Sequence, residues 1–233
     1  MTHLLLAFFA VSALFADSQM NEAMFQRTAN NFTKKLQPLV QERHAHLEIQ
    51  TFWTAELLTR AESEQPVGDD IVEQIRRVGG ATSWRRSEVW YLGVTGGIAR
   101  HHAITRDALE LVLCHELGHL MVPDIRDEDS ADYYATSACL KELWRHDLPR
   151  KNEVPAELSL LCKEDDLCER IGLAAHGAAV FLYEFYIEYD PKNQLTRPSF
   201  ASKAKNYKDR AQCRLENLMS GATGGPLMKC QGN

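Results

Sequence analysis

The sequence has no excess of positive charge, no Cys-x-x-Cys pair, and no internal repeat or low-complexity tract. Its net charge of −6 argues against the basic surface through which proteins usually bind nucleic acid, so no nucleic-acid partner is expected. Without a Cys-x-x-Cys pair, neither a zinc knuckle nor a thioredoxin-like redox site is expected. The 233 residues, of which 45% are hydrophobic, suffice for one sizeable core.

The N-terminus carries an apolar run, Leu4–Ala16, that is uninterrupted by charge and ends before Asp17. This length suits the hydrophobic region of a signal peptide and is too short to span a bilayer. The preceding Met1–His3 lacks the usual Lys or Arg, so a buried N-terminal helix or a membrane-surface anchor is the alternative. We expect a signal peptide over 1–16, a single mature domain over 17–233, a periplasmic or secreted location, and no stable membrane insertion after cleavage.

Six cysteines lie in the expected mature chain, and their even number is that of a disulfide framework formed in an oxidising compartment. The sequence alone does not choose a pairing among them. Buried free thiols are the alternative, especially for Cys114, which lies in an apolar segment. The six are Cys114, Cys139, Cys162, Cys168, Cys213 and Cys230.

Helices dominate the expected secondary structure. Apolar periodicity predicts helices over residues 18–37, 71–78, 105–121, 127–145, 167–189 and 207–220. Alternation predicts strands over residues 46–53 and 87–95. Pro38 is expected to end the first helix, and the acidic stretch 149–166 is expected to be a loop. Periodicity alone therefore indicates a mixed, helix-rich domain.

The segment HELGH carries two histidines, His115 and His119, that lie one helical turn apart, so both rings project from the same helix face. Neutral imidazoles at this spacing bind one zinc ion, and Glu116 can then reach a water on that metal. Zinc lowers the pKa of the water, and Glu116 accepts its proton as the general base. The alternative is a solvated helix face with two surface histidines. A third protein ligand is still required.

The acidic segment Glu128–Asp132 reads E-x-x-A-D and is expected to begin the next helix. Only the eight residues 120–127 separate it from the first motif, and short helix connections favour antiparallel neighbours. Glu128 is therefore expected to bind zinc. Asp132, one turn later on the same face, is expected to hydrogen-bond a ligating histidine.

Other ligand sets are less compatible with the residues that follow His119. A metzincin requires a glycine and a histidine where Val122 and Ile125 stand. Asp124 or Asp129 as the third ligand, closer to an aspartate-type zincin, is the open alternative. It is disfavoured because Asp124 follows a proline in the turn and Asp129 points away from the face of Asp132.

The strand Val89–Gly97 is expected to be the edge strand that binds extended substrate by strand addition, with an ordinary sheet strand as the alternative. A donor that stabilises the oxyanion of the transition state is also expected. The candidates are His176, Tyr133, Tyr134 and Arg214, and His176 also suits a buried core histidine because its helix is apolar.

Four further histidines lie outside the HELGH motif and are candidates for additional roles. His44 and His46 share one side of a predicted strand and suggest a second metal pair, but an upstream partner is missing. His101 and His102 are expected at the surface near the mouth of the cleft.

The pair HELGH and E-x-x-A-D resembles the gluzincin metallopeptidases, including the CAAX prenyl protease family, whose members have transmembrane helices and a longer gap between the motifs. A closer resemblance is to small exported bacterial metallopeptidases that carry four successive motifs, G-G-x-A-R-H, C-H-E-x-G-H, E-x-x-A-D-Y and Q-C-R-L. Leu-Met-Val-Pro after His119 departs from the glycine-containing turn of that group. The motifs correspond here to Gly96–His101, Cys114–His119, Glu128–Tyr133 and Gln212–Leu215.

This resemblance implies an α+β, zincin-like fold, helix-rich with a small sheet beside the active-site helix, and one Zn²⁺ per chain. It implies hydrolysis of a peptide or protein substrate. A non-catalytic protein that zinc stabilises for binding or structure, and an amidase acting on cell wall, are the alternatives. Cleavage specificity and oligomeric state are not predicted.

Overall fold

The computed structural model describes residues 20–53, 79–122, 127–147, 153–189, 195, 197–204 and 209–230. The expected signal peptide and the helix expected over 71–78 lie outside these residues. The described elements, in chain order, are α2 Glu22–Gln41, β1 His46–Phe52, β2 Ala81–Arg86, β3 Val89–Thr95, α5 Gly96–Arg100, α6 Arg106–Met121, α7 Glu128–Tyr134, the π-helix η2 Ala135–Cys139, α8 Leu140–Leu143, α9 Ala156–Cys162, α10 Asp166–Tyr189 and α11 Arg210–Thr223.

The three strands form one mixed sheet in the order β1-β3-β2. β3 pairs in parallel with β1, Leu47 opposite Trp90, and antiparallel with β2, Trp84 opposite Tyr91. The sequence did not predict β2, which has no fully buried face and joins β3 through a tight turn at Ser87, where φ is +55°. The predicted strands over 46–53 and 87–95 are confirmed as β1 and β3, apart from their end residues.

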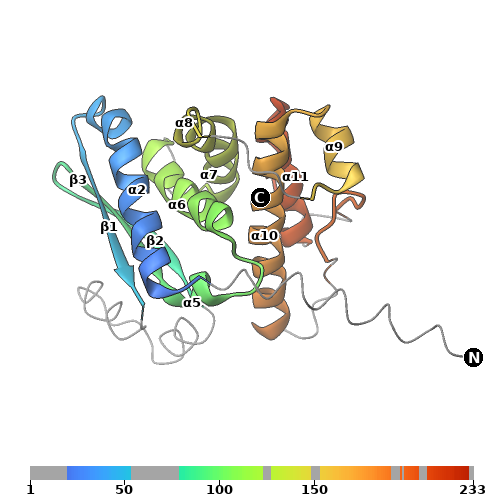
Figure 1. Cartoon of the computed structure of the whole chain (residues 1–233), viewed down its shortest axis with the longest axis horizontal. Helices are drawn as coiled ribbons and strands as arrows, with labels where there is room; N and C mark the ends of the chain where they lie inside the picture. Colours follow the sequence, from blue (N-terminus) through green and yellow to red (C-terminus); the bar gives the residue numbers. More distant parts are fainter. Residues whose placement is uncertain are drawn as a thin grey trace, which may run out of the picture.

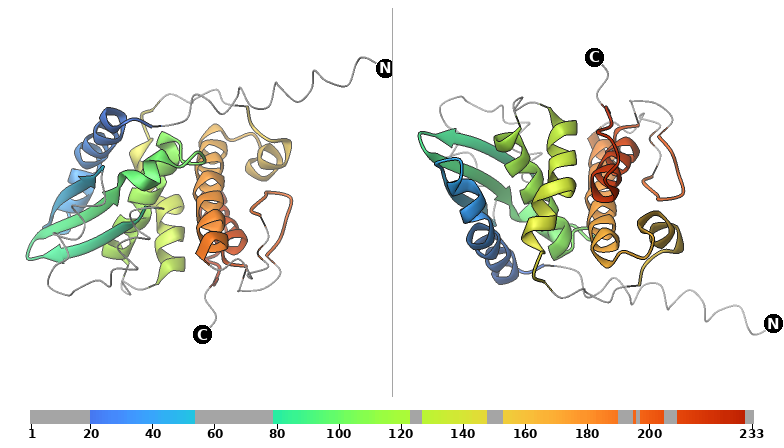
Figure 2. Two further views of the ribbon diagram at one scale, coloured as in Figure 1. Left: turned by 90° about the horizontal axis from the view of Figure 1, so that it is seen from below. Right: turned by 90° about the horizontal axis from the view of Figure 1, so that it is seen from above.

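Helix α6 lies between the sheet and the long helix α10 (Figure 1). Helix α2 packs beside α6 and over β1, whereas α10 and α11 lie on the other side of α6 (Figures 1 and 2). Because α6 is enclosed on both sides, 13 of its 16 residues are buried. The helix that carries the HELGH motif is therefore the central element of the core, and the solvated-face alternative is wrong.

The helices predicted over 105–121 and 127–145 are confirmed, with changes in their ends and in their regularity. Thr105 caps α6 by accepting a hydrogen bond from the backbone N–H of Ala108 over 3.2 Å. The helix predicted over 127–145 runs without a break through α7, η2 and α8, with one wide π turn in the middle. Asp127 caps its first turn through the N–H of Ser130.

Two predictions about chain breaks are wrong. Pro38 does not end α2, which continues for one more turn to Gln41, because proline removes only its own N–H and Glu42 N–H still bonds to Pro38 O. The predicted loop 149–166 contains helix α9. Leu158 of α9 is fully buried against Gly172 of α10, and this packing gives the short helix a reason to form.

Within the described ranges, no helix combines the length and the apolarity that crossing a membrane requires. The structure is helix-rich, with a small three-stranded sheet and three disulfides.

Candidate metal centre

Three side chains from α6 and α7 converge at one point. Nε2 of His115 lies 3.0 Å from Nε2 of His119. The carboxylate of Glu128 reaches both rings, with Oε2 3.2 Å from Nε2 of His115 and Oε1 3.5 Å from Nε2 of His119. The two histidines are buried, and Glu128 is partly exposed, so the group opens to solvent on one side.

These spacings fit the donor set of a tetrahedral zinc ion. Two donor atoms about 2.1 Å from such an ion lie about 3.4 Å apart, which is close to the three distances between these side chains. Nε2 of His119 faces the other two donors, while its buried Nδ1 has no hydrogen-bond partner among the described residues. Two imidazoles and one carboxylate leave a fourth position open, as in catalytic rather than structural zinc sites.

Asp132 orients His115 through a hydrogen bond at the ring nitrogen Nδ1, which faces away from the other two donors. Its Oδ1 lies 2.7 Å from Nδ1 of His115, which directs Nε2 toward His119 and Glu128. Arg214 of α11 donates from Nε to Oδ2 and from Nη2 to Oδ1 of Asp132, each over 2.6 Å. Asp132 is buried and Arg214 is partly exposed, and the sequence analysis predicted the role of Asp132 but not its pairing with this arginine.

The charges of the centre are strongly coupled. Burial works to raise the pKa of Asp132, but Arg214 and His115 outweigh it and hold that pKa below its usual range. Burial would lower the pKa of His115, yet the hydrogen-bonded carboxylates of Asp132 and Glu128 raise it to about 9. The pKa of Glu128 lies well below its usual range because both histidines and Arg214 overcome its burial. A metal ion at this point therefore has to displace a proton from His115.

Glu116 lies on the same helix as the two histidines and lines the same cavity as His115 and Glu128. Burial raises its pKa, although the nearby histidines and a hydrogen bond with Ser83 of β2 act in the opposite direction. A carboxylate with a raised pKa beside a metal centre is suited to accept a proton near neutral pH. Sequence spacing located Glu116, but not its contact with Ser83.

The hairpin of α6 and α7 depends on a close backbone approach at Gly118. A Cβ atom there would lie 2.9 Å from both the Cα and the carbonyl oxygen of Ala131. The glycine of HELGH and the alanine of E-x-x-A-D are therefore the contact point between the two motifs. This approach brings Glu128 to the histidines.

The alternative third ligands are not supported by the described residues. The carboxylate of Asp129 accepts a hydrogen bond of 2.9 Å from the N–H of Cys230, on the side of α7 that faces the C-terminal segment. Asp124 lies outside the described residues.

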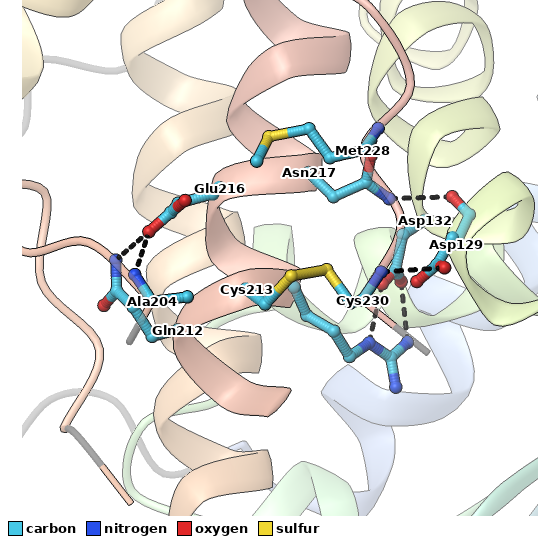
Figure 3. Close-up of a disulfide and its surroundings, with 10 residues drawn as sticks. Asp129, Asp132, Ala204, Gln212, Cys213, Glu216, Asn217, Met228 and Cys230 are labelled. Atoms are coloured by element: carbon cyan, nitrogen blue, oxygen red, sulfur yellow. Dashed lines mark hydrogen bonds and ion pairs between the residues drawn. A yellow bond between two sulfur atoms is a disulfide. The ribbon is translucent and has the colours of Figure 1, made fainter. Parts of the chain in front are cut away.

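Two disulfides border the centre. Cys114, which precedes His115, is bonded to Cys139 of η2. Cys213, which precedes Arg214, is bonded to Cys230. Figure 3 shows the second disulfide beside Asp129, with the backbone N–H of Cys230 donating a hydrogen bond to the carboxylate of that aspartate.

The third disulfide joins Cys162 to Cys168, so all six cysteines are paired and the free-thiol alternative is wrong.

Asn217 fixes the backbone next to Glu128. Its side chain donates to Asp129 O over 2.7 Å and accepts from Met228 N–H over 2.9 Å (Figure 3). The side chain is fully buried, so both ends of the amide are used in an apolar setting. The C-terminal segment is thereby attached to α7 one residue after Glu128.

The candidate oxyanion donors lie in different places. The hydroxyl of Tyr133 donates to Gly225 O over 2.7 Å, and Nε2 of His176 lies 3.1 Å from Pro198 O. Tyr134 packs against the hydrophobic core, and burial raises its pKa to about 12. None of these three lines the metal-centre cavity, so the structure does not support them as oxyanion donors. Arg214 does line this cavity, and its Nη2 lies 3.5 Å from Oε2 of Glu128.

The prediction that the strand Val89–Gly97 binds substrate is wrong, because β3 is the central strand and both of its edges are paired. Residues 96 and 97 already belong to α5. The edge strand next to α6 is β2. Ser83 of β2 hydrogen-bonds Glu116, and Arg85 of β2 donates to Leu120 O at the end of α6.

Of the accessory histidines, His101 and His102 form a second group of possible metal donors with Glu184, whereas His44 and His46 belong to no such group among the described residues. Nε2 of His101 and Nε2 of His102 lie 3.1 and 3.5 Å from the carboxylate of Glu184. Nδ1 of His101 accepts a hydrogen bond from Ala103 N–H over 3.3 Å. The two histidines follow α5 and Glu184 lies on α10, so this group joins the two elements.

A cavity of about 260 Å³ opens beside the donors. One wall is apolar and is formed mainly by α10, which presents residues at helical spacing. They are Ala178, Phe181, Leu182 and Phe185.

Comparison of the chain with protein-family models, curated proteins and solved structures finds no match.

Proposed function

We propose that the chain is a zinc-dependent metallopeptidase of the gluzincin type with a zincin-like fold. The observation that carries the proposal is the convergence of His115, His119 and Glu128, with Glu116 lining the same cavity as His115 and Glu128. The arrangement of a small sheet beside the helix that carries these residues supports the same assignment. An unrelated polar helix hairpin would have no reason to bury these ionisable groups together.

Zinc bound by the two histidines and Glu128 would supply a Lewis acid that makes water more acidic and polarises the scissile carbonyl. Glu116 accepts the proton of the attacking water at its carboxylate and later delivers it to the departing amine. Asp132 keeps His115 oriented, and Arg214 keeps Asp132 ionised within the protein. Of the residues named for the oxyanion, Arg214 is the one near enough to Glu128 to act there.

The substrate is proposed to be an extended peptide that lies along β2. This strand is the sheet edge beside α6, and Ser83 brings it next to the general base. Strand addition uses the backbone of the peptide, so it accepts many sequences. The apolar wall of α10 would then receive a hydrophobic side chain of the peptide.

The proposed location is periplasmic or secreted, after removal of residues 1–16. Three disulfides support an oxidising compartment, because cytosolic thiols are normally kept reduced.

The decisive experiment measures bound zinc and peptide hydrolysis in the oxidised protein. Wild type is expected to hold one zinc per chain and to cleave an unfolded protein substrate. Glu128→Ala should lose the zinc, whereas Glu116→Gln should keep it and lose turnover. Glu48→Gln, on the exposed side of β1, is the matched control and should change neither.

The same samples test the alternatives. Zinc binding without hydrolysis of any peptide, combined with a lower melting temperature after chelation, would favour a non-catalytic protein. Release of fragments from peptidoglycan but not from protein would favour a cell-wall amidase. Retained turnover in Glu116→Gln would remove the proposed base.

A further inference from the structure

A second cavity adjoins the metal centre on the other side of Glu128. Its volume is about 260 Å³, and it shares Glu128 and Arg214 with the first cavity. It is bounded by α7, α10, α11 and the C-terminal segment. Its lining residues are Glu128, Asp129, Tyr186, Arg210, Arg214 and Cys230.

The charged groups of this cavity are satisfied with one exception. Arg214 is bound to Asp132, and the carboxylate of Asp129 accepts from Cys230 N–H (Figure 3). Arg210 lies one helical turn before Arg214, so both side chains leave α11 on the same face. Arg210 is exposed and forms no ion pair with any other described residue.

The two cavities differ in character. The first has an apolar wall from α10, whereas the second is lined by two arginines, Tyr186 and the acidic residues Glu128 and Asp129. A peptide bound across the metal centre would therefore place a hydrophobic side chain on one side and meet a guanidinium on the other. Guanidinium groups bind carboxylates through two parallel N–H donors, with geometric as well as electrostatic preference.

We infer that Arg210 forms a subsite for the free C-terminal carboxylate of a peptide substrate, so that the protein removes residues from the ends of chains. This inference rests on the proposed function. The cavity has about the same volume as the first, about 260 Å³, and is lined by Arg210 and Cys230, so it can receive the last residue of a peptide with its carboxylate beside Arg210. The disulfide to Cys213 holds Cys230 at that wall.

The reaction is hydrolysis of the peptide bond that joins the last residue or residues to the chain. Water adds its oxygen to the carbonyl carbon, the C–N bond breaks, and the proton accepted by Glu116 goes to the leaving amine. The products are a shortened peptide with a new carboxylate and a free amino acid or short C-terminal fragment. Arg210 binds substrate and takes no part in the proton transfer.

The test measures binding separately from turnover. Glu116→Gln protein loaded with zinc is titrated by calorimetry with acetyl-Ala-Ala-Phe-Ala, either with a free C-terminus or as the C-terminal amide. The free acid is expected to bind about tenfold more tightly. Adding Arg210→Ala should remove the preference, and Arg210→Lys should keep part of it. Arg27→Ala on α2, another exposed arginine, should leave it unchanged.

A third peptide, acetyl-Ala-Ala-Phe-Glu amide, carries its only carboxylate on a side chain. Equal or tighter binding of this peptide than of the free acid would overturn the assignment to the chain end. Equal binding of acid and amide by the parent protein, or a preference that survives in Arg210→Ala, would overturn the subsite.

Mass spectrometry of wild-type digests then gives the cleavage positions. Loss from the C-terminus of the free acid, with the amide cut slowly, is expected. Absence of any cleavage would contradict the proposed peptidase function, while the calorimetric preference would still decide the carboxylate subsite.

Discussion

Gly118 of α6 and Ala131 of α7 are in backbone contact, and the space between them does not admit a methyl group. A Cβ on residue 118 would stand 2.9 Å from the Cα and the carbonyl oxygen of Ala131. The separation of the two helices is therefore set at one point. In sequence, Gly118 lies between His115 and His119, and Ala131 lies between Glu128 and Asp132.

Gly118→Ala is expected to force the two helices apart. Overpacking of this kind costs roughly 1–3 kcal/mol, which exceeds the gain that alanine normally gives in a helix. Chemical denaturation and a zinc-affinity titration should both report a loss. Ala131→Gly should not restore either quantity, because the blocking atoms are backbone atoms; a full rescue would contradict the proposed contact.

Asp132→Asn is expected to weaken zinc binding about 10- to 100-fold. The amide keeps the shape of the carboxylate but no longer balances the buried charge of Arg214 or orients His115 as strongly. Competition with a metal indicator measures the effect. Asp166→Asn, an exposed change at the start of α10, provides the control, and equal affinities in the two variants would count against this role of Asp132.

Replacing both Cys213 and Cys230 by serine should lower both stability and zinc affinity. The disulfide closes a separation of 17 residues, a loop length for which the stabilisation is roughly 3 kcal/mol. It also holds the segment that bonds to Asp129, next to Glu128.

The matched variant replaces Cys162 and Cys168, which are 6 residues apart. It should lower the melting temperature without changing zinc affinity. If the two double variants affect zinc equally, the Cys213–Cys230 disulfide has no special relation to the centre.

The ion pairs of Asp147 should make the stability of the fold depend on pH in the acid range. Burial acts to raise its pKa, but Lys35, 2.5 Å away, and Arg170 lower it below the ordinary value. A carboxyl with a lowered folded-state pKa stabilises the protein above its unfolded pKa of about 3.9, and this contribution is lost as pH falls below that value.

Asp147→Asn is therefore expected to be less stable than wild type near neutral pH, by up to about 1 kcal/mol for such a partly exposed pair. Urea denaturation between pH 7 and pH 3 should show the difference shrinking as the medium becomes acidic. Lys35→Met should remove most of this dependence, and a difference that grows in acid would contradict the ion-pair explanation.

The donors of the metal centre were predictable from sequence because helical geometry is local. Residues four apart lie on the same face of any α-helix, whatever the fold around it. This spacing relates His115 to His119 and Glu128 to Asp132. The short connection between the motifs then favoured the antiparallel hairpin. These steps needed no knowledge of the rest of the chain.

The surroundings of the centre were not predictable in this way. Arg214 was a sequence candidate only as an oxyanion donor; its pairing with Asp132, and the positions of Arg210 and Tyr186, depend on the packing of α10 and α11, which no local pattern in the sequence specifies. The edge strand was sought at 89–97 because the strand Ala81–Arg86 was not predicted. β3 is mostly buried and lies in the middle of the sheet, whereas the polar β2 is an edge.

The disulfide between Cys114 and Cys139 spans a separation of 25 residues. The proposed base and all the proposed donors, together with the aspartate that orients His115, fall between these two cysteines in the chain. Oxidation therefore turns this part of the chain into a covalent macrocycle that carries all the proposed metal-binding groups. The ends of this ring cannot separate even when the chain unfolds, so the donors remain concentrated near one another and recapture of the ion costs less conformational entropy.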